Sequence, residues 1–125
     1  MPAALCIAAV AGTLLASVPA DRFELSWTHS VEKIAWREAW AVADGGLVLE
    51  EAAIRGHGAG MEVPDGAVLE GGWWRYRPDL APLERVVLAN STFTSDYELC
   101  AAGACTPLAA LTGTPDRPVA LFPCP

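Results

Sequence analysis

The chain has 125 residues and a formal net charge of −7, with 15 acidic residues against 8 lysines and arginines. This length predicts one domain with a single core. The acidic balance and the scattered arginines exclude the basic surface typical of a nucleic-acid-binding protein, and they predict no attraction to anionic lipid.

Residues 1–20 carry no charge and are mostly apolar. This composition is typical of a secretory signal peptide, and Val18-Pro19-Ala20 supplies small residues for cleavage. The usual basic residues before the apolar region are missing, so an uncleaved N-terminal membrane anchor is the other interpretation. A buried first helix is a third. We expect a signal or anchor at 1–20 and one exported domain over residues 21–125.

Residues 23–42 alternate between apolar and polar side chains. Alternation over this length predicts two antiparallel strands, each with one buried face. His29 and Glu38 are polar residues on the apolar faces. A two-residue turn at Glu32-Lys33 makes them diagonal neighbours, and a four-residue turn places them directly opposite each other. In either register we expect the imidazole and the carboxylate to meet among tryptophans.

The remainder of the chain predicts short strands separated by turns. Asp44-Gly45-Gly46 favours a tight turn, and residues 47–55 then predict a third strand antiparallel to the second. Residues 68–76 predict one strand with a bulge or bend at Gly71-Gly72. A total of about seven to eight strands predicts an all-β fold, a small antiparallel β-sandwich or barrel. The other strands are predicted over residues 85–89, 97–100, 105–108 and 119–122.

His29 and Glu38 carry the main chemical hypothesis. A carboxylate beside an imidazole favours the protonated ring and fixes its orientation. We expect a ligand-binding pocket here, and a buried pair that only satisfies its own hydrogen bonds is the structural alternative. His57 lies in the glycine-rich segment 56–61, and loops on rigid scaffolds often carry binding residues. The two histidines and Glu38 also match a two-histidine, one-carboxylate metal set, although their spacing does not specify one.

A catalytic serine is not supported. Ser30 adjoins His29, but neighbours in a regular strand point to opposite faces and cannot form a nucleophile–base pair. The sequence contains no GxSxG nucleophile elbow and no cofactor motif. We therefore expect no catalytic residue and no cofactor.

The cysteines suit an exported chain, in which disulfides persist. We predict a Cys100–Cys105 bridge. A hairpin with Ala102-Gly103 at its tip makes these cysteines a non-hydrogen-bonded pair with Cα atoms about 4.5 Å apart, within disulfide range. The rival is Cys105–Cys124, which would join the last strand to the sheet. The sequence has no CxxC pair, so a structural zinc site is not expected.

Several of these motifs together resemble the domain-of-unknown-function family 1850. They are WTHSVEK at 27–33 with Trp36 and Glu38, the segment 56–61, and the cysteine hairpin at 99–108. The resemblance runs from Phe23 to the end of the chain. It implies a small exported or membrane-anchored bacterial protein, often encoded beside TRAP/TAXI-type transporters, with no catalytic activity attached. The family's motif positions fall on His29, Ser30, Glu38, Gly58 and Gly60, and His57 is not part of the pattern.

We therefore expect a periplasmic binding or accessory protein of a TRAP/TAXI-type solute transporter. Its partners would be transporter components or their solute. The alternatives are a small hydrolase that uses His29 and Glu38 as acid and base, and a structural envelope protein without a ligand. An enzyme would need a nucleophile or a metal, and the sequence shows no convincing one. The expected ligand-binding residues are His29, Ser30, Glu38, His57, Gly58 and Gly60.

Overall fold

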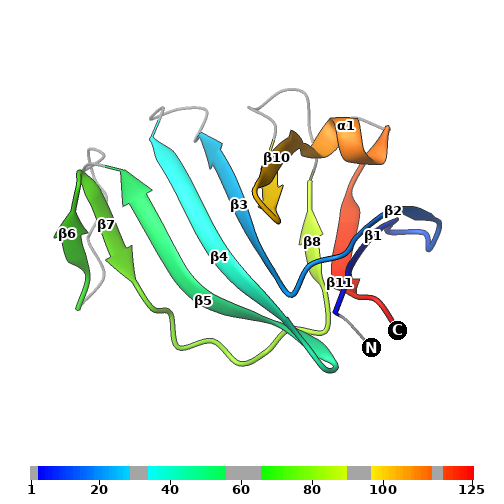
Figure 1. Cartoon of the computed structure of the whole chain (residues 1–125), viewed down its shortest axis with the longest axis horizontal. Helices are drawn as coiled ribbons and strands as arrows, with labels where there is room; N and C mark the ends of the chain where they lie inside the picture. Colours follow the sequence, from blue (N-terminus) through cyan, green and yellow to red (C-terminus); the bar gives the residue numbers. More distant parts are fainter. Residues whose placement is uncertain (1–2, 29–33, 56–65, 90–96, 114–116) are drawn as a thin grey trace.

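The structure, a computed structural model, describes residues 3–28, 34–55, 66–89, 97–113 and 117–125. Within these residues the chain forms eleven strands and one short helix. The strands make two antiparallel sheets that pack together as an open sandwich (Figure 1). The predicted all-β sandwich is therefore confirmed, and the described strands do not close into a barrel.

The large sheet has seven strands and contains the predicted first hairpin. Its strands β4 (Ala35–Ala43) and β5 (Gly46–Arg55) are antiparallel, as predicted, and join through a turn in which Gly45 has a φ of +76°. Only glycine reaches such a φ without strain. In spatial order the strands are β10 (Ala104–Pro107), β9 (Glu98–Ala101), β3 (Arg22–Thr28), β4 (Ala35–Ala43), β5 (Gly46–Arg55), β7 (Trp73–Tyr76) and β6 (Val68–Glu70).

Residues 68–76 form two strands, where one bent strand was predicted. Gly71 and Gly72 have φ values of +60° and +87°, and β6 and β7 pair on either side of them. Two consecutive residues with positive φ make a tight hairpin turn whose twist matches the flanking strands. The glycines therefore reverse the chain, and β6 becomes the edge of the large sheet.

The small sheet joins the two ends of the chain. Strand β1 (Leu5–Ala9) pairs with β11 (Val119–Pro123) in antiparallel register, from Leu5 opposite Pro123 to Ala9 opposite Val119. A disulfide between Cys6 and Cys124 adds a covalent link across these two strands. In spatial order the strands are β2 (Leu14–Val18), β1 (Leu5–Ala9), β11 (Val119–Pro123) and β8 (Val86–Leu88).

In this structure β1 and β2 place residues 5–18 in the small sheet, as a hairpin that was not predicted from the sequence. The signal or anchor at 1–20 stays a prediction. Leu5 and Ile7 are fully buried, and β1 and β2 form a hairpin around Gly12, whose φ is +112°. A charge-free segment suits a buried hairpin as well as a signal peptide, because both need apolar side chains. Among the described residues no helix is long and apolar enough to cross a bilayer.

The core lies between the two sheets. From the small sheet it receives Leu5, Ile7 and residues of β11, and from the large sheet it receives Leu25 and Trp40. Burying such side chains contributes about 1.5–3 kcal/mol each. The core therefore ties β3 and β4, which carry the predicted site, to a rigid base.

One helical turn closes an end of the sandwich. Helix α1 (Leu108–Thr112) follows Pro107 and ends at Gly113, which has a φ of +68°. Leu108 was predicted as the end of a strand, but it is the first residue of this helix and is fully buried in the core. The proline fixes the φ that precedes the helix, and the glycine allows the left-handed cap.

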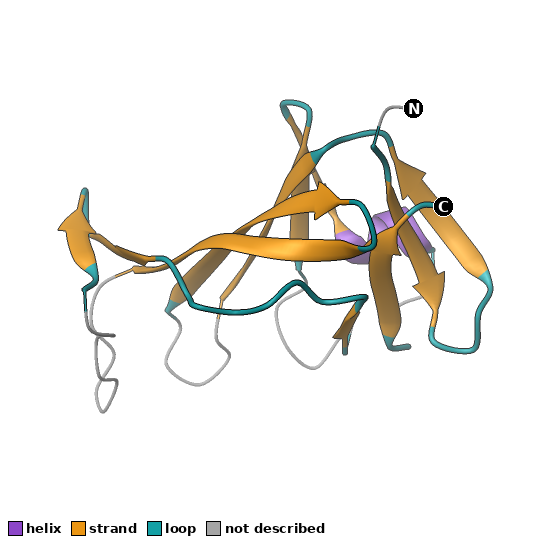
Figure 2. Ribbon diagram, turned by 90° about the horizontal axis from the view of Figure 1, so that it is seen from below, coloured by secondary structure: helices purple, strands orange, loops and turns teal. Residues whose placement is uncertain are grey.

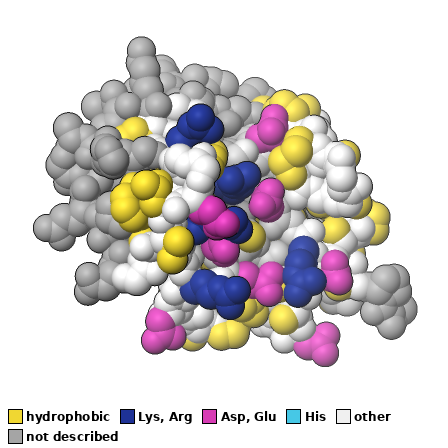
Figure 3. Space-filling view, turned by 60° about the vertical axis from the view of Figure 1, so that its left-hand side comes forward, with side chains coloured by type: hydrophobic (Ala, Val, Ile, Leu, Met, Phe, Trp, Pro, Cys, Tyr) yellow, Lys and Arg dark blue, Asp and Glu magenta, His cyan; other side chains and the backbone are white. Residues whose placement is uncertain are grey.

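The large sheet is wider than the small one. Figure 2 shows that it extends past the small sheet on the side of β7 and β6. Alternation gives the sheet an inner face, which carries Leu25, Glu38 and Trp40, and an outer face, which carries Glu24 and Arg37. Figure 3 shows acidic and basic side chains interleaved on one side of the molecule, with no patch of a single sign among the coloured residues.

Candidate functional site

The candidate site is centred on Glu38, in the middle of β4 on the inner face of the large sheet. Glu38 pairs with Leu25 of β3 on one side and with Ala52 of β5 on the other. Ala52 pairs in turn with Tyr76 of β7. Because the alanine side chain is small, Glu38 and Tyr76 face each other across it.

Glu38 accepts a hydrogen bond from the indole of Trp40, two residues further along β4. Trp40 Nε1 lies 3.2 Å from Glu38 Oε1. Trp40 is 3% exposed and stacks on Phe23, with ring centroids 6.3 Å apart. Burial raises the pKa of Glu38, and the hydrogen bond from Trp40, which favours the charged form, opposes this only in part. The fold therefore holds a carboxyl group that is biased toward its neutral form.

Two tyrosines lie close enough to Glu38 to feel its charge. Burial raises the pKa of Tyr76 and of Tyr97, and the negative charge of Glu38 raises both further. Their hydroxyl groups therefore remain protonated above the ordinary tyrosine pKa of about 10. Tyr97 also packs against Trp27, with ring centroids 5.3 Å apart. The carboxyl group is thus surrounded by aromatic rings that carry neutral hydrogen-bond donors.

A row of tryptophans crosses the same face one step from Glu38. Trp27 lies directly opposite Trp36, and the two rings stack with centroids 6.0 Å apart. Ile54 separates Trp36 from Trp74 in this row. The Nε1 atoms of Trp36 and Trp74 are buried, and neither has a hydrogen-bond partner among the described residues. An unsatisfied buried donor costs about 1–3 kcal/mol, so two on one face indicate a place for an acceptor.

The register of the first hairpin differs from both predicted registers. Trp27 pairs with Trp36, and Glu38 pairs with Leu25, which lies four residues before His29 in the sequence. The prediction placed His29 opposite or diagonal to Glu38. Alternation fixes the face on which a residue lies but not the length of the turn, which sets the register. The chemical partners of Glu38 in the described structure are therefore Trp40 and the two tyrosines.

The other predicted site residues lie outside the described residues. They are His29, Ser30, His57, Gly58 and Gly60. Their proposed roles stay predictions, as does the two-histidine metal set. Trp74, Tyr76 and Tyr97 were not predicted as site residues. The sequence contained part of the information needed to find them, because the alternation of a strand places Trp74 and Tyr76 on the same face.

The cysteine hairpin lies on a different face from Glu38. Cys100 and Cys105 are directly opposite each other in β9 and β10 and form a disulfide, with Cα atoms 4.0 Å apart. Leu99 points into the core, so Cys100 points to the outer face. Cys124 is bonded to Cys6 and not to Cys105, the rival pairing that the sequence left open.

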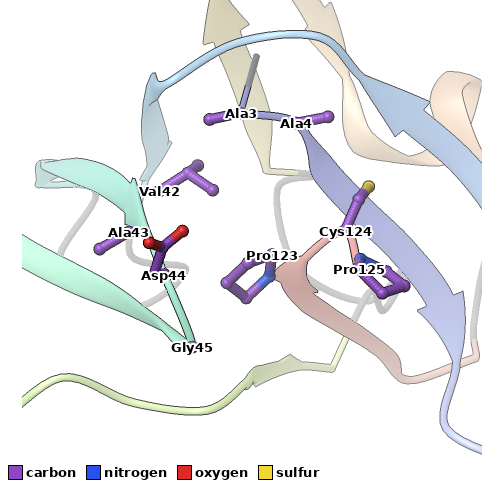
Figure 4. Close-up of a pocket in the computed structure, with 9 residues that line it drawn as sticks. All are labelled: Ala3, Ala4, Val42, Ala43, Asp44, Gly45, Pro123, Cys124 and Pro125. Atoms are coloured by element: carbon purple, nitrogen blue, oxygen red, sulfur yellow. The ribbon is translucent and has the colours of Figure 1, made fainter. Parts of the chain in front are cut away.

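A separate hollow of about 320 Å³ lies where the β4–β5 turn meets the two ends of the chain (Figure 4). Asp44 is the one charged side chain among the residues that line it. The rest are small or apolar: Ala3, Ala4, Val42, Ala43, Gly45, Pro123, Cys124 and Pro125. None of them is a predicted site residue, and a single exposed carboxylate does not define a ligand.

The fold and the site define a small β-sandwich domain with a half-buried carboxyl group on an aromatic sheet face. The chain belongs to the family described as "Domain of unknown function (DUF1850)", whose family model matches residues 23–108. This confirms the resemblance seen in the sequence. The match covers the large sheet and β8, and β1, β2 and β11 lie outside it. No curated protein and no solved structure gives a significant match.

Proposed function

We propose that the protein binds a small solute with hydrogen-bond acceptors, such as an organic acid, on the aromatic face around Glu38. One observation carries the proposal: the Nε1 donors of Trp36 and Trp74 are buried with no partner in the part of the chain that the structure describes, and they lie beside a carboxyl group whose pKa is raised by burial. Ligand sites are mostly apolar and contain a few placed polar groups. When Glu38 is protonated, its carboxyl group adds a third donor to the two indoles, so a ligand with acceptors fits the site.

The biological setting proposed is the cell envelope, where the protein would serve a TRAP/TAXI-type transporter through its solute or its subunits. The family resemblance suggests this role, and the two disulfides support an oxidising compartment. Membrane anchoring at the N-terminus stays part of the proposal, and it requires β1 and β2 to leave the small sheet. Cell fractionation, with trapping of free thiols before lysis, tests the location. Crosslinking to the transporter's subunits tests the partner.

Thermal melts against a panel of mono- and dicarboxylates and neutral sugars test the binding proposal. A ligand at a hundredfold excess over its Kd stabilises the native state by about 2.7 kcal/mol. Trp36→Phe and Trp74→Phe each remove one donor and keep an aromatic ring, so each should reduce the shift. The matched control is Glu24→Gln, on the neighbouring strand but on the outer face. If both tryptophan variants show the same ligand-induced increase in melting temperature as the wild type, the ligand binds elsewhere.

The second candidate function is a hydrolase that uses His29 and Glu38 as acid and base. The observation that favours it is the raised pKa of Glu38, because a general acid works best with a pKa near the working pH. Turnover of chromogenic esters that is lost in Glu38→Gln would support it. Binding without turnover would leave the binding protein as the better description. A purely structural envelope role predicts neither binding nor turnover.

A further inference from the structure

The β9–β10 hairpin gathers three metal-binding side chains on the outer face of the large sheet. Glu98 and Cys100 share this face because they are two residues apart on β9, and Cys105 lies opposite Cys100 on β10. The ligand atoms of all three residues lie within 4.8 Å of one another. Glu98 Oε1 is 3.9 Å from Cys100 Sγ, but a disulfide sulfur has no hydrogen to donate. The carboxylate therefore gains nothing from this contact while the bridge is closed.

The surroundings of this hairpin favour a cation. Glu24 of β3 pairs with Cys100, so a second carboxylate lies beside the sulfurs. Among the described residues neither Glu24 nor Glu98 has an ion-pair partner, whereas nearby Arg22 is paired with Glu50 at 3.0 Å. Glu24, Cys100 and Cys105 line a common hollow of about 430 Å³, which leaves room for water or a further ligand. Two carboxylates disfavour free thiolates, and a bound cation removes that penalty.

The two disulfides differ in access. Cys105 is exposed and Cys100 is half-buried, whereas in the other bridge Cys6 is 6% exposed and Cys124 is half-buried. Thiol–disulfide exchange requires an incoming thiolate to reach one sulfur, so Cys105 Sγ is the accessible target. The hairpin bridge is therefore the more accessible of the two, and we expect it to open first.

We propose that the β9–β10 hairpin is a redox-gated site for a thiophilic divalent cation, closed as a disulfide and formed on reduction by Cys100, Cys105 and Glu98. A dithiol reductant supplies two electrons and two protons. Its first thiolate attacks Cys105 Sγ, which breaks the Cys100–Cys105 bond, releases Cys100 as a thiolate and leaves Cys105 in a mixed disulfide with the reductant. The second thiolate of the reductant then attacks the reductant's own first sulfur, so that Cys105 is released and the reductant becomes a cyclic disulfide. The two protons of the reductant pass to the two cysteine thiolates. The cation displaces the two thiol protons and takes Glu98 as its third ligand. Three protein ligands and one open position are typical of reactive zinc sites.

Zn²⁺ is the probe in a competition titration against a chromophoric chelator, with protein reduced under anaerobic conditions. We expect the reduced protein to bind one equivalent at this site and the oxidised protein to bind none there. Glu98→Gln should weaken binding at least about tenfold, since loss of an outer-shell partner alone acts on that scale. Cys105→Ser should abolish it. Glu70→Gln, at the far edge of the sheet, is the matched control and should bind like the reduced wild type.

Alkylation followed by mass mapping shows which bridge has opened, and near-ultraviolet circular dichroism shows whether the reduced protein stays folded. Co²⁺ adds a second readout, because thiolate ligands give it a charge-transfer band in the near ultraviolet. If both bridges open, the losses in Cys105→Ser and Glu98→Gln still assign the site. The proposal is overturned if the reduced protein binds no Zn²⁺, if it unfolds, or if either variant binds like the wild type.

Discussion

Glu38 and Trp40 lie two residues apart on β4 and hold each other in place, with Trp40 Nε1 3.2 Å from Glu38 Oε1. The indole is buried and needs an acceptor, and the carboxyl group is partly buried and needs a donor. The bond satisfies both residues, but it does not restore the hydration that the carboxylate loses. The pKa of Glu38 therefore stays raised, and the contribution of this pair to stability depends on pH.

The first prediction is that Glu38→Gln makes the domain more stable at neutral pH. The pKa of Glu38 is raised in the folded state by burial, so the native protein binds its proton more tightly than the unfolded chain does. This contribution is fully present below the unfolded value of about 4.3, and it is lost as the pH rises through the folded pKa. Glutamine has no proton to lose and still offers Trp40 an acceptor. Denaturation in urea from pH 4 to pH 8 measures the difference.

The stability gap between Glu38→Gln and the wild type should open as the pH rises through this window and then stay constant. Glu24→Gln on the outer face is the control and should give no such window. Glu38→Ala removes the acceptor as well and should lose about 1–3 kcal/mol relative to Glu38→Gln, because the Trp40 donor is left unpaired. A wild type that becomes more stable across this pH range would contradict the assignment.

The second prediction concerns the pH dependence of solute binding. If a carboxylate ligand accepts a hydrogen bond from neutral Glu38, binding takes up a proton and affinity rises as the pH falls. Isothermal titration in two buffers of different ionisation enthalpy measures the proton uptake directly. In Glu38→Gln the uptake should vanish even where binding persists. Tighter binding at higher pH would instead indicate that Glu38 binds as an anion.

The third prediction tests the place of the N-terminal hairpin in the core. Ile7 is fully buried, so Ile7→Ala should cost about 2–5 kcal/mol. Leu14 on the adjacent strand is 58% exposed, and Leu14→Ala should stay within about 0.5 kcal/mol of the wild type. Urea denaturation of both variants gives the comparison. Equal and small effects would mean that β1 is not a core strand in solution.

The fourth prediction ranks the two disulfides. The Cys6–Cys124 bridge closes a loop with a sequence separation of 118, and the Cys100–Cys105 bridge closes one of 5. Chain entropy assigns about 4.7 kcal/mol to a loop of 100 residues and less than ~3 kcal/mol to a loop shorter than 15. In two separate variants, both cysteines of one pair are replaced with serine. The variant that lacks the Cys6–Cys124 bridge should lose far more stability than the variant that lacks the Cys100–Cys105 bridge. The opposite ranking in equilibrium unfolding would contradict this.

The fold class followed from residue patterns, but the arrangement of the site did not. Alternation correctly placed Glu38 on the face of Trp36 and Trp40. Alternation carries no information on the number of residues in the turn, so the predicted register was wrong. The contribution of Tyr76 depends on Ala52, a small residue between distant strands, and no local pattern reports such a gap.

The first twenty residues show a different limit of sequence patterns. An apolar, charge-free segment meets the needs of an export signal and of a buried hairpin equally well. Partners decide between them, and the partner of β1 is β11, at the opposite end of the chain. Only the complete fold brings Cys6 to Cys124, so neither the pairing nor the burial of Ile7 could be read locally.

The bridge between Cys6 and Cys124 also determines how the domain bears load. A pull on the two chain ends would pass through one sulfur–sulfur bond, because every strand residue except Leu5 lies inside the closed loop. The hydrogen-bonded ladders of both sheets would carry little of that tension. A protein tethered by one end and held by a partner at the other would lengthen only in its flanking segments. The aromatic face around Glu38 would keep its geometry under such a load.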